Sequence, residues 1–365
     1  FLPYLRSKIS DYSFAIGTKY NSDTWFIDIS NSFGTNNFHF FVENSLNRAY
    51  GDSTPTNFDA GLLGFIQNSL NIDFSKNMES IIGISKSYLN FGAEFRYESY
   101  KQTKGELASY YAPNPNFEPG SQVFPGFAPQ NEINKSAISI AGYLDLEGNI
   151  TENWFINLGT RYENYDSDNS AIVGKIASIY KFYEEFFNLR FSIGSGYRMP
   201  SLQQRFYNKN NTQFVNFGTG FFPVEIATLT NDNEVVKALG FPELKAEQSM
   251  NYSLGFTSQL SNNTSLTLDA YFIEINDRIV LSGLFTKFDP YIAELIKNIP
   301  GADAFQFFTN AINTRTKGID IVLNQKFDLS NYGNLNITIA ANISETSLFG
   351  NIKTSNTLPD SVYAS

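Results

Sequence analysis

Charged side chains recur in closely spaced pairs, and they are the first candidates for chemistry in this chain. Glu94 stands two residues before Arg96, and Arg161 stands two residues before Glu163. A carboxylate beside a base could perform general acid–base work. In a strand, however, a spacing of two puts both side chains on one face. We therefore predict that these four residues, together with Arg190, are lumen-facing residues of a polar wall rather than catalytic groups.

Other catalytic arrangements lack the residues that they need. His39 is the single histidine, and the chain has no cysteine. A zinc site would need several histidines or thiolates, and with this single histidine we expect no histidine-based catalytic triad. We expect His39 to be a loop or interface residue. The sequence therefore predicts no enzyme activity, no metal site and no cofactor.

Aromatic side chains gather with turn-forming proline and glycine in the long connections. These rings have two possible roles, which the sequence leaves open: capture of an apolar or planar ligand at an outer rim, or packing of the loops on themselves, as aromatic side chains do in cores. The candidate ligand-binding residues are Tyr110, Tyr111, Phe124, Phe127, Phe221 and Phe222.

The elements that must position these groups are strands with a strict two-residue period. In residues 334–344, Leu, Ile and Ala alternate with Asn, Thr and Ser, which predicts a strand with one apolar and one polar face. The pattern recurs, and residues 171–182 follow it least well. Near Ile273 the phase slips, which a bulge or an exit from lipid would explain. We predict twelve strands, at residues 12–20, 25–32, 65–74, 88–103, 136–148, 154–165, 171–182, 187–198, 250–257, 265–273, 318–327 and 334–344.

Connections between the predicted strands alternate in length. Short turns are expected near 21–24, 75–79, 151–153, 183–185, 261–263 and 330–332, and long loops near 34–64, 104–135, 199–247 and 283–312, with one short exception near 166–170. Short turns at one rim and long loops at the other are typical of outer-membrane barrels. Trp25 and Trp154 each begin a strand after a short turn, which marks that rim as a membrane interface. Residues 233–239 and 291–298 are expected to be helical.

Composition supports a membrane barrel and excludes several other classes. Charged residues make up only 17% of the chain, whereas 35 Phe and 21 Tyr bring the aromatic share to 16%. The net charge of −10 argues against nucleic acid as a partner. No run of 18 apolar residues exists, which excludes helical membrane spans. Because so many polar side chains cannot enter a dry core unpaired, the polar face is expected to line a lumen and the apolar face to contact outer-membrane lipid.

An even number of strands leaves both chain ends at one rim, which loop length marks as the outer rim. No signal peptide opens the chain, which begins Phe-Leu-Pro-Tyr. We therefore expect residues 1–365 to be one partial β-barrel domain from within a larger barrel, with an N-terminal part and the last strands lying outside it; the family resemblance described next implies that this N-terminal part is a plug.

Several short runs, taken in order, resemble one family. The run Gly-Tyr-Arg-Met-Pro-Ser at 196–201 and the run Leu-Lys-Ala-Glu-Gln-Ser at 244–249 are similar to runs of TonB-dependent outer-membrane receptors, with Ala246 in place of the usual proline. Asn-Tyr-Ser-Leu-Gly at 251–255 follows the second run at the family's spacing. Further similar runs lie at 91–96, 159–163, 269–272, 277–279, 310–313 and 317–320. The loops, such as residues 50–61, resemble those of receptors from the Bacteroidetes.

The resemblance implies an all-β, transmembrane antiparallel barrel of about 22 strands closed by a plug. It also implies energised import of a scarce ligand through the inner-membrane TonB complex, with an iron–siderophore complex as the first expectation and cobalamin, a glycan or a peptide as alternatives. The expected location is the outer membrane of a Gram-negative cell. Two other readings remain open: a passive porin or adhesin-like barrel without a plug, and a soluble all-β binding protein.

Overall fold

The computed structural model describes residues 2–166, 169–182, 186–216, 220–299 and 301–355. The strands are β1 (Tyr4–Asn21), β2 (Trp25–Glu43), β3 (Asn57–Asn77), β4 (Ser80–Ile81), β5 (Ile84–Thr103), β6 (Ile133–Thr151), β7 (Trp154–Tyr165), β8 (Asn169–Phe182), β9 (Phe187–Arg198), β10 (Lys209–Asn216), β11 (Phe221–Leu229), β12 (Glu247–Ser261), β13 (Thr264–Leu281), β14 (Phe285–Thr286), β15 (Ala304–Asp328) and β16 (Asn334–Phe349). The helices are α1 (Leu107–Tyr110), α2 (Leu202–Phe206), α3 (Glu234–Ala238) and α4 (Pro290–Ile296), with 3-10 turns η1 (Arg48–Ser53), η2 (Pro129–Asn131) and η3 (Ser330–Tyr332). Each of the twelve predicted strands lies within one of these strands.

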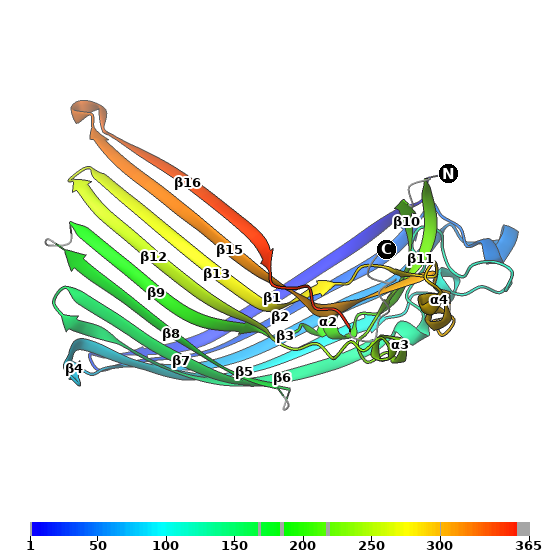
Figure 1. Ribbon diagram of the computed structural model, residues 1–365, viewed down its shortest axis with the longest axis horizontal. Helices are drawn as coiled ribbons and strands as arrows, with labels where there is room; N and C mark the ends of the chain where they lie inside the picture. The colour runs from blue at the N-terminus through cyan, green and yellow to red at the C-terminus, as the bar shows by residue number, and fades with distance from the viewer. Residues whose placement is uncertain (1, 167–168, 183–185, 217–219, 300, 356–365) are drawn as a thin grey trace.

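The long strands form one antiparallel sheet in the order β1-β2-β3-β5-β6-β7-β8-β9-β12-β13-β15, and β16 pairs with β15. The sheet curves into a trough, with the short turns gathered at one end and α3, α4, β10 and β11 gathered at the other (Figure 1). Trp25 and Trp154 begin β2 and β7 at the end of the short turns, as predicted. In the part of the sheet that the structure describes, β1 and β16 are the two edges of the trough. The predicted short turn at 183–185 lies outside the described residues, as do positions 167 and 168 of the predicted short connection near 166–170.

The two faces of the trough differ as the alternation predicts. On the convex face Leu158 pairs with Ile176 of β8, and Ile176 pairs with Ile193 of β9. These aliphatic side chains point outward, with Leu158 41% exposed and Ile176 51% exposed. Polar side chains occupy the concave face, where curvature brings them together. A continuous apolar outer face of this kind is what a bilayer requires of a barrel wall.

Several strands extend far beyond the predicted bounds at the long-loop end, so two of the predicted loops are shorter than expected, and the predicted loop 199–247 contains the strand pair β10 and β11. β2 and β3 stay paired as far as Glu43 and Asn57, which shortens the expected loop 34–64 to residues 44–56. β15 already begins at Ala304, inside the expected loop 283–312. Of the two expectations for His39, the loop position is wrong for the same reason, because His39 lies within β2, where its Nε2 is 2.8 Å from Asp59 Oδ1. The interface position stays a prediction. Strands that project past the lipid need no apolar alternation, so their sequence gives no two-residue signal.

β13 contains a bulge, but it follows Ile273 and Ile275 rather than preceding them, so it does not cause the predicted phase slip. Pairing between β13 and β15 is continuous through Ile275 and Thr314 and then shifts at Arg278. Asp277 adopts φ 56° there, and its amide donates to Asn313 Oδ1 at 2.9 Å. The extra residue re-aims the strand where it leaves the sheet's regular part.

The long connections fold into an outer layer with its own apolar core. β11 runs parallel to the beginning of β15, and α3 and α4 pack beside it. Both helices match the predicted segments and begin at side-chain caps: Asn233 accepts from the amide of Val235, and Asp289 accepts from the amides of Tyr291 and Ile292. The buried core is Ala227, Leu229, Val235, Val236, Leu239, Ile292, Ile296, Ile299, Phe305 and Phe307. Among the described residues, no helix has the length and apolar character that a membrane span requires.

Candidate functional site

The four paired charges predicted from their spacing meet in one cluster on the concave face, which we call the wall cluster (Glu94, Arg96, Arg161 and Glu163). Arg96 Nε donates to Glu94 at 2.8 Å, and its second nitrogen lies 3.2 Å from Glu163. Arg161 lies 2.8 Å from Glu94 and 2.9 Å from Glu163. Glu163 is 5% exposed. Every charge therefore has two partners of the opposite sign, which offsets the cost of partial burial.

The wall cluster joins two strands that are not neighbours, and β6 between them makes this possible. Glu94 of β5 pairs with Ala141 of β6, which in turn pairs with Glu163 of β7. Ser139, the other β6 residue at this level, donates its hydroxyl to Glu163. Because Ala141 and Ser139 are small, the long side chains of β5 and β7 reach each other across them. The spacing within each strand predicted the pairs, but the cross-strand contact depends on register.

Arg190, the fifth predicted wall residue, also forms a salt bridge across an intervening strand, two strands further along the sheet. It donates to Asp269 of β13 at 2.8 Å and to Thr257 of β12 at 2.9 Å. Gly255 of β12 pairs with both Arg190 and Asp269. A Cβ at Gly255 would lie 2.2 Å from the Asp269 carboxylate, so the salt bridge needs glycine at this position. Small residues on the polar face therefore help to predict which charged side chains meet across a strand, and charge spacing alone does not give this.

Three of the runs that carry the family resemblance meet at Glu247. Arg198, from the run 196–201, donates to Glu247 through two nitrogens, at 2.9 and 2.5 Å. Glu247 belongs to the run 244–249 and also accepts from the amide of Ile279 at 2.8 Å. The carboxylate therefore ties β9, β12 and β13 together at the outer end of the sheet.

The segment after the run 196–201 turns inward over the wall. Ser201 caps α2 by accepting from the amide of Gln204, and the Gln204 side chain accepts from the Ser201 amide at 3.1 Å. Leu202 is 1% exposed and packs in a cluster with Tyr100 and Tyr165. Below α2 lies a cavity of about 540 Å³ that is lined in part by wall-cluster residues and by Arg198. The chain thus places an open polar chamber directly under α2.

Among the predicted loop aromatics, Phe124 and Phe127 come together inside the loop layer. Their rings meet edge to face at 6.3 Å, and Phe124 stacks on Phe40 at 5.1 Å. Phe127 is fully buried. The Lys209 amine lies 2.8 Å from the centre of the Phe124 ring and 4.4 Å from that of Phe127. Burial lowers the pKa of Lys209 to about 6. These two rings pack the loops together, which is the second of the two roles considered from the sequence.

The other four predicted aromatics lie nearer the surface. Tyr111 is 48% exposed, and Phe221 and Phe222 are 70% and 47% exposed at the start of β11. Tyr110 lines a cavity of about 310 Å³ together with Glu118 and Glu225. Burial raises the pKa of Glu225, and the carboxylates of Glu118 and Asp303 raise it further, against a hydrogen bond from Thr212. Ligand contact by these four rings stays a prediction.

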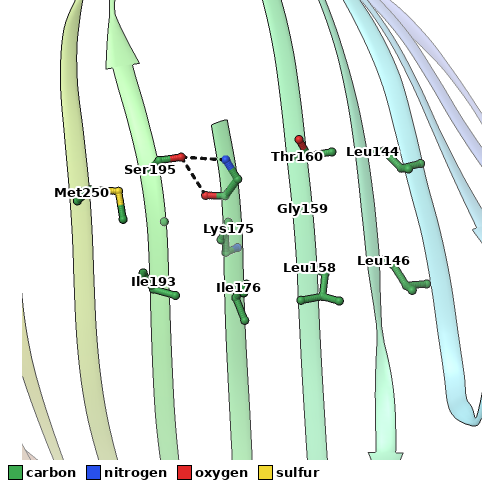
Figure 2. Close-up of a pocket in the computed structure, with 12 residues that line it drawn as sticks. Leu144, Leu146, Leu158, Gly159, Thr160, Lys175, Ile176, Ile193, Ser195 and Met250 are labelled. Carbon is green, nitrogen blue, oxygen red and sulfur yellow. Dashed lines mark hydrogen bonds between the residues drawn. The ribbon is translucent and has the colours of Figure 1, made fainter. Parts of the chain in front are cut away.

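A further cavity, of about 620 Å³, lies on the convex face and is unsuited to a polar ligand. Figure 2 shows its floor, where Leu158, Ile176 and Ile193 stand in a row beside Ser195. β8 is paired with β9 only up to Lys175, and beyond that point the Ser195 hydroxyl bonds to the backbone of Gly174, accepting from its amide at 2.9 Å. The cavity is a shallow dent where small residues interrupt an apolar surface, so acyl chains of the bilayer would fill it.

The curved sheet is apolar outside and polar inside, and the four charges of the wall cluster are paired with one another. These features define the wall of a transmembrane β-barrel. Within the described residues, no group of three or more His, Asp or Glu side chains is placed to hold a metal ion. The family model "TonB dependent receptor-like, beta-barrel" matches residues 2–362. The chain belongs to this family, whose members are outer-membrane barrels.

Solved structures of the family share the fold at low sequence identity. The RagAB peptide transporter matches with a TM-score of 0.60 and 13% identity over 95% of this chain and 37% of its own. The ferric enterobactin receptor PfeA (an R480A, Q482A double mutant) of Pseudomonas aeruginosa matches with a TM-score of 0.60 and 12% identity, over 92% of this chain and 44% of its own. The ferric yersiniabactin receptor FyuA of Yersinia pestis matches with a TM-score of 0.52 and 12% identity, over 95% of this chain and 44% of its own. The chain thus spans less than half of these proteins, and no curated protein sequence matches it.

Proposed function

We propose that this chain forms part of a receptor that imports a scarce ligand across the outer membrane of a Gram-negative cell, with energy supplied through TonB. The family match over residues 2–362 is the observation that carries the proposal. An iron–siderophore complex is the first candidate ligand. The similar structures include siderophore receptors and a peptide transporter, so their names support more than one ligand class.

The wall supports a plugged barrel better than a passive porin. In the wall cluster each charge is already paired with two others, and Glu163 is almost fully buried by the side chains around it. Because these charges are already paired, a plug domain can pack against the wall without leaving a buried charge unpaired. In this proposal TonB acts on the plug, while the barrel wall stays rigid.

Uptake experiments in a deletion strain test the proposal. Cells lacking the receptor are expected to lose growth when one ferric siderophore is the sole iron source and to regain it when the gene is restored. Uptake of radiolabelled ferric siderophore by the wild type should stop when a protonophore collapses the proton gradient. Uptake that persists without the gradient would instead indicate a passive porin. A growth defect confined to peptides, glycans or cobalamin would replace the siderophore with that ligand.

A further inference from the structure

The barrel wall is interrupted between β8 and β9, in the outer half of the sheet. β8 pairs with β7 along its whole length. Its pairing with β9 stops at Lys175 and Gly194, and beyond that point β9 pairs only with β12. We call this unpaired stretch, residues 169–174 of β8 opposite residues 195–198 of β9, the wall gap. Because both flanking strands are present, the gap lies within the wall rather than at an edge of the trough.

The backbone of β8 presents an open strand edge in the wall gap. Alternate residues of a strand direct their N–H and C=O groups to opposite neighbours. Gly174 faces β9, because its amide donates to Ser195 Oγ at 2.9 Å and its carbonyl accepts from the same hydroxyl at 3.4 Å. Val173 faces β7, where its carbonyl accepts from a threonine hydroxyl at 3.1 Å. Ile172 and Ser170 therefore face β9, and among the described residues β9 offers them no ladder partner.

The wall gap lies at a depth where unpaired backbone is unfavourable. Tyr180 pairs with Trp154 at the short-turn rim. With a rise of about 3.3 Å and a tilt of about 45°, Gly174 and Ser170 lie roughly 14 and 23 Å from that rim, within an apolar band about 25 Å tall. Ile172 is 75% exposed there. Since non-helical backbone at membrane depth must contact protein or water, this edge needs either water from the lumen or a polar chain in its place.

Cavities border the wall gap on three sides, so an added chain has room. Gly174 and Ser195 line the convex cavity of about 620 Å³, and Val173 and Gly196 line the chamber of about 540 Å³. Asn169 lines a third cavity, of about 300 Å³, at the outer end of the gap. The convex cavity has mainly aliphatic walls, whereas wall-cluster residues line the chamber. A chain in the gap would therefore have apolar surroundings on one side and polar surroundings on the other.

We propose that the wall gap binds an extended peptide, which adds to β8 as an extra strand. A peptide backbone supplies donors and acceptors at the two-residue spacing of Ile172 and Ser170. Its side chains would alternate between the apolar convex side and the polar chamber. The inference rests on the proposed receptor function, and among the candidate ligands it favours a peptide. A ligand without amides cannot match the open edge in this way.

Binding of defined peptides to the full-length receptor in detergent tests the proposal without any need for TonB. The parent probe is acetyl-Val-Ser-Val-Ser-Val-amide, and calorimetry measures affinity. Two derivatives carry N-methyl groups on the amides of their second and fourth residues, or of their first, third and fifth. We expect at least one derivative to bind about tenfold more weakly than the parent, because methylation removes the donors that face β8. A peptide of the same composition with its three valines adjacent should also bind more weakly, because it cannot place them on one face.

Amide hydrogen exchange locates the contact. In the receptor without peptide, the amides of Ile172 and Ser170 should exchange faster than that of Val173, which faces β7. The parent peptide should slow exchange at Ile172 and Ser170 by about tenfold and leave Val173 unchanged.

One receptor variant changes the open edge directly. Ile172→Pro removes an N–H that forms no bond to β7, and it should weaken binding of the parent peptide about tenfold. The control Ile176→Val changes the same face where β8 still pairs with β9, and it should bind like the wild type. The urea midpoint checks that both variants are folded.

The outcomes decide the proposal. Weaker binding of one methylated derivative supports pairing with β8 alone, and weaker binding of both, with slowed exchange at Ile172 and Ser170, supports pairing with β8 and β9 together. Equal affinity for the parent and both derivatives would overturn the proposal, and so would binding that leaves exchange at these two amides unchanged. If Ile172→Pro fails to fold, the methylated peptides and exchange in the wild type still decide. Because energised uptake is measured separately, the wall gap can fail to bind peptide while the receptor function holds.

Discussion

An arginine placed on the convex face should destabilise the barrel far more than one placed on the concave face at similar depth. Leu158 is the best convex position, because its cross-strand partners Leu146 and Ile176 are apolar and offer an arginine no hydrogen bond. Asn71 is the matched concave position. It is half-buried and pairs with Ser30 on one side and Glu94 on the other, so an arginine there stays in a polar environment.

The magnitude follows from depth in the membrane. Leu158 is four residues from Trp154, which marks the rim, and at a rise of about 3.3 Å and a tilt of about 45° it lies roughly 9 Å inside it. The apolar band is about 25 Å tall, so this position is close to the midplane, where arginine costs about 2 to 4 kcal/mol. Asn71 lies five residues inside Lys76, which pairs with Trp25 at the same rim. We expect Leu158→Arg to lower the free energy of unfolding by about 2 to 3 kcal/mol and Asn71→Arg by less than about 1 kcal/mol.

Urea titration of the receptor folded into phosphatidylcholine vesicles measures both changes, with Trp25 and Trp154 as fluorescence probes. The wild type and Thr18→Ser, a change at an exposed position of β1, provide the baseline. If Leu158→Arg proves harmless, or if Asn71→Arg costs as much as Leu158→Arg, the assignment of the convex face to lipid is wrong.

Three further predictions concern the wall and the loop layer. Glu163→Gln should lower the free energy of unfolding by about 3 kcal/mol, because it leaves the wall-cluster arginines with only one carboxylate; the urea titration checks this, and a change below about 0.5 kcal/mol would contradict it. Gly92→Val should cost about 1 to 3 kcal/mol, because its Cβ would meet the Tyr143 ring at 2.6 Å, and an unchanged unfolding midpoint would refute this. Burial lowers the pKa of Lys209 to about 6, so the loop binds a proton more readily when it is open than when it is folded. The free energy of opening the loop should therefore rise by about 2 kcal/mol from pH 6 to pH 8. Hydrogen exchange of residues 104–132, corrected for intrinsic rates, should show this rise in the wild type and no rise in Lys209→Met; equal pH dependence would contradict it.

The strands could be predicted from sequence because lipid imposes a two-residue period on each of them. Where the strands leave the membrane that constraint ends, and β2 and β15 continue well past the point at which alternation stops. The short pair β10 and β11 was missed for the same reason, because its residues are held by the loop layer rather than by lipid. Both predicted helices in the loops were confirmed, since Asn233 and Asp289 are local capping signals that need no tertiary context.

The candidate site was only partly visible in the sequence. Spacing placed Glu94 and Arg96 on one face, but their contact with β7 depends on the small residues Ser139 and Ala141 at matching register on β6. The 540 Å³ chamber under α2 could not be predicted, because it brings together Phe65, Arg161 and Leu202 from segments far apart in the chain. Such a site is created by the way in which the outer loops fold, and no periodic pattern records that.

Spin-label accessibility along β7 tests the central claim most directly. Residues 1–365 contain no cysteine, so single cysteines at positions 157, 158, 161 and 162 can carry a nitroxide without background labelling from this part of the barrel. In vesicles, labels at Leu158 and Tyr162 should collide frequently with lipid-soluble oxygen, whereas labels at Asn157 and Arg161 should not. Oxygen accessibility that fails to alternate between these neighbours, or that is low at all four, would show that the convex face does not contact lipid.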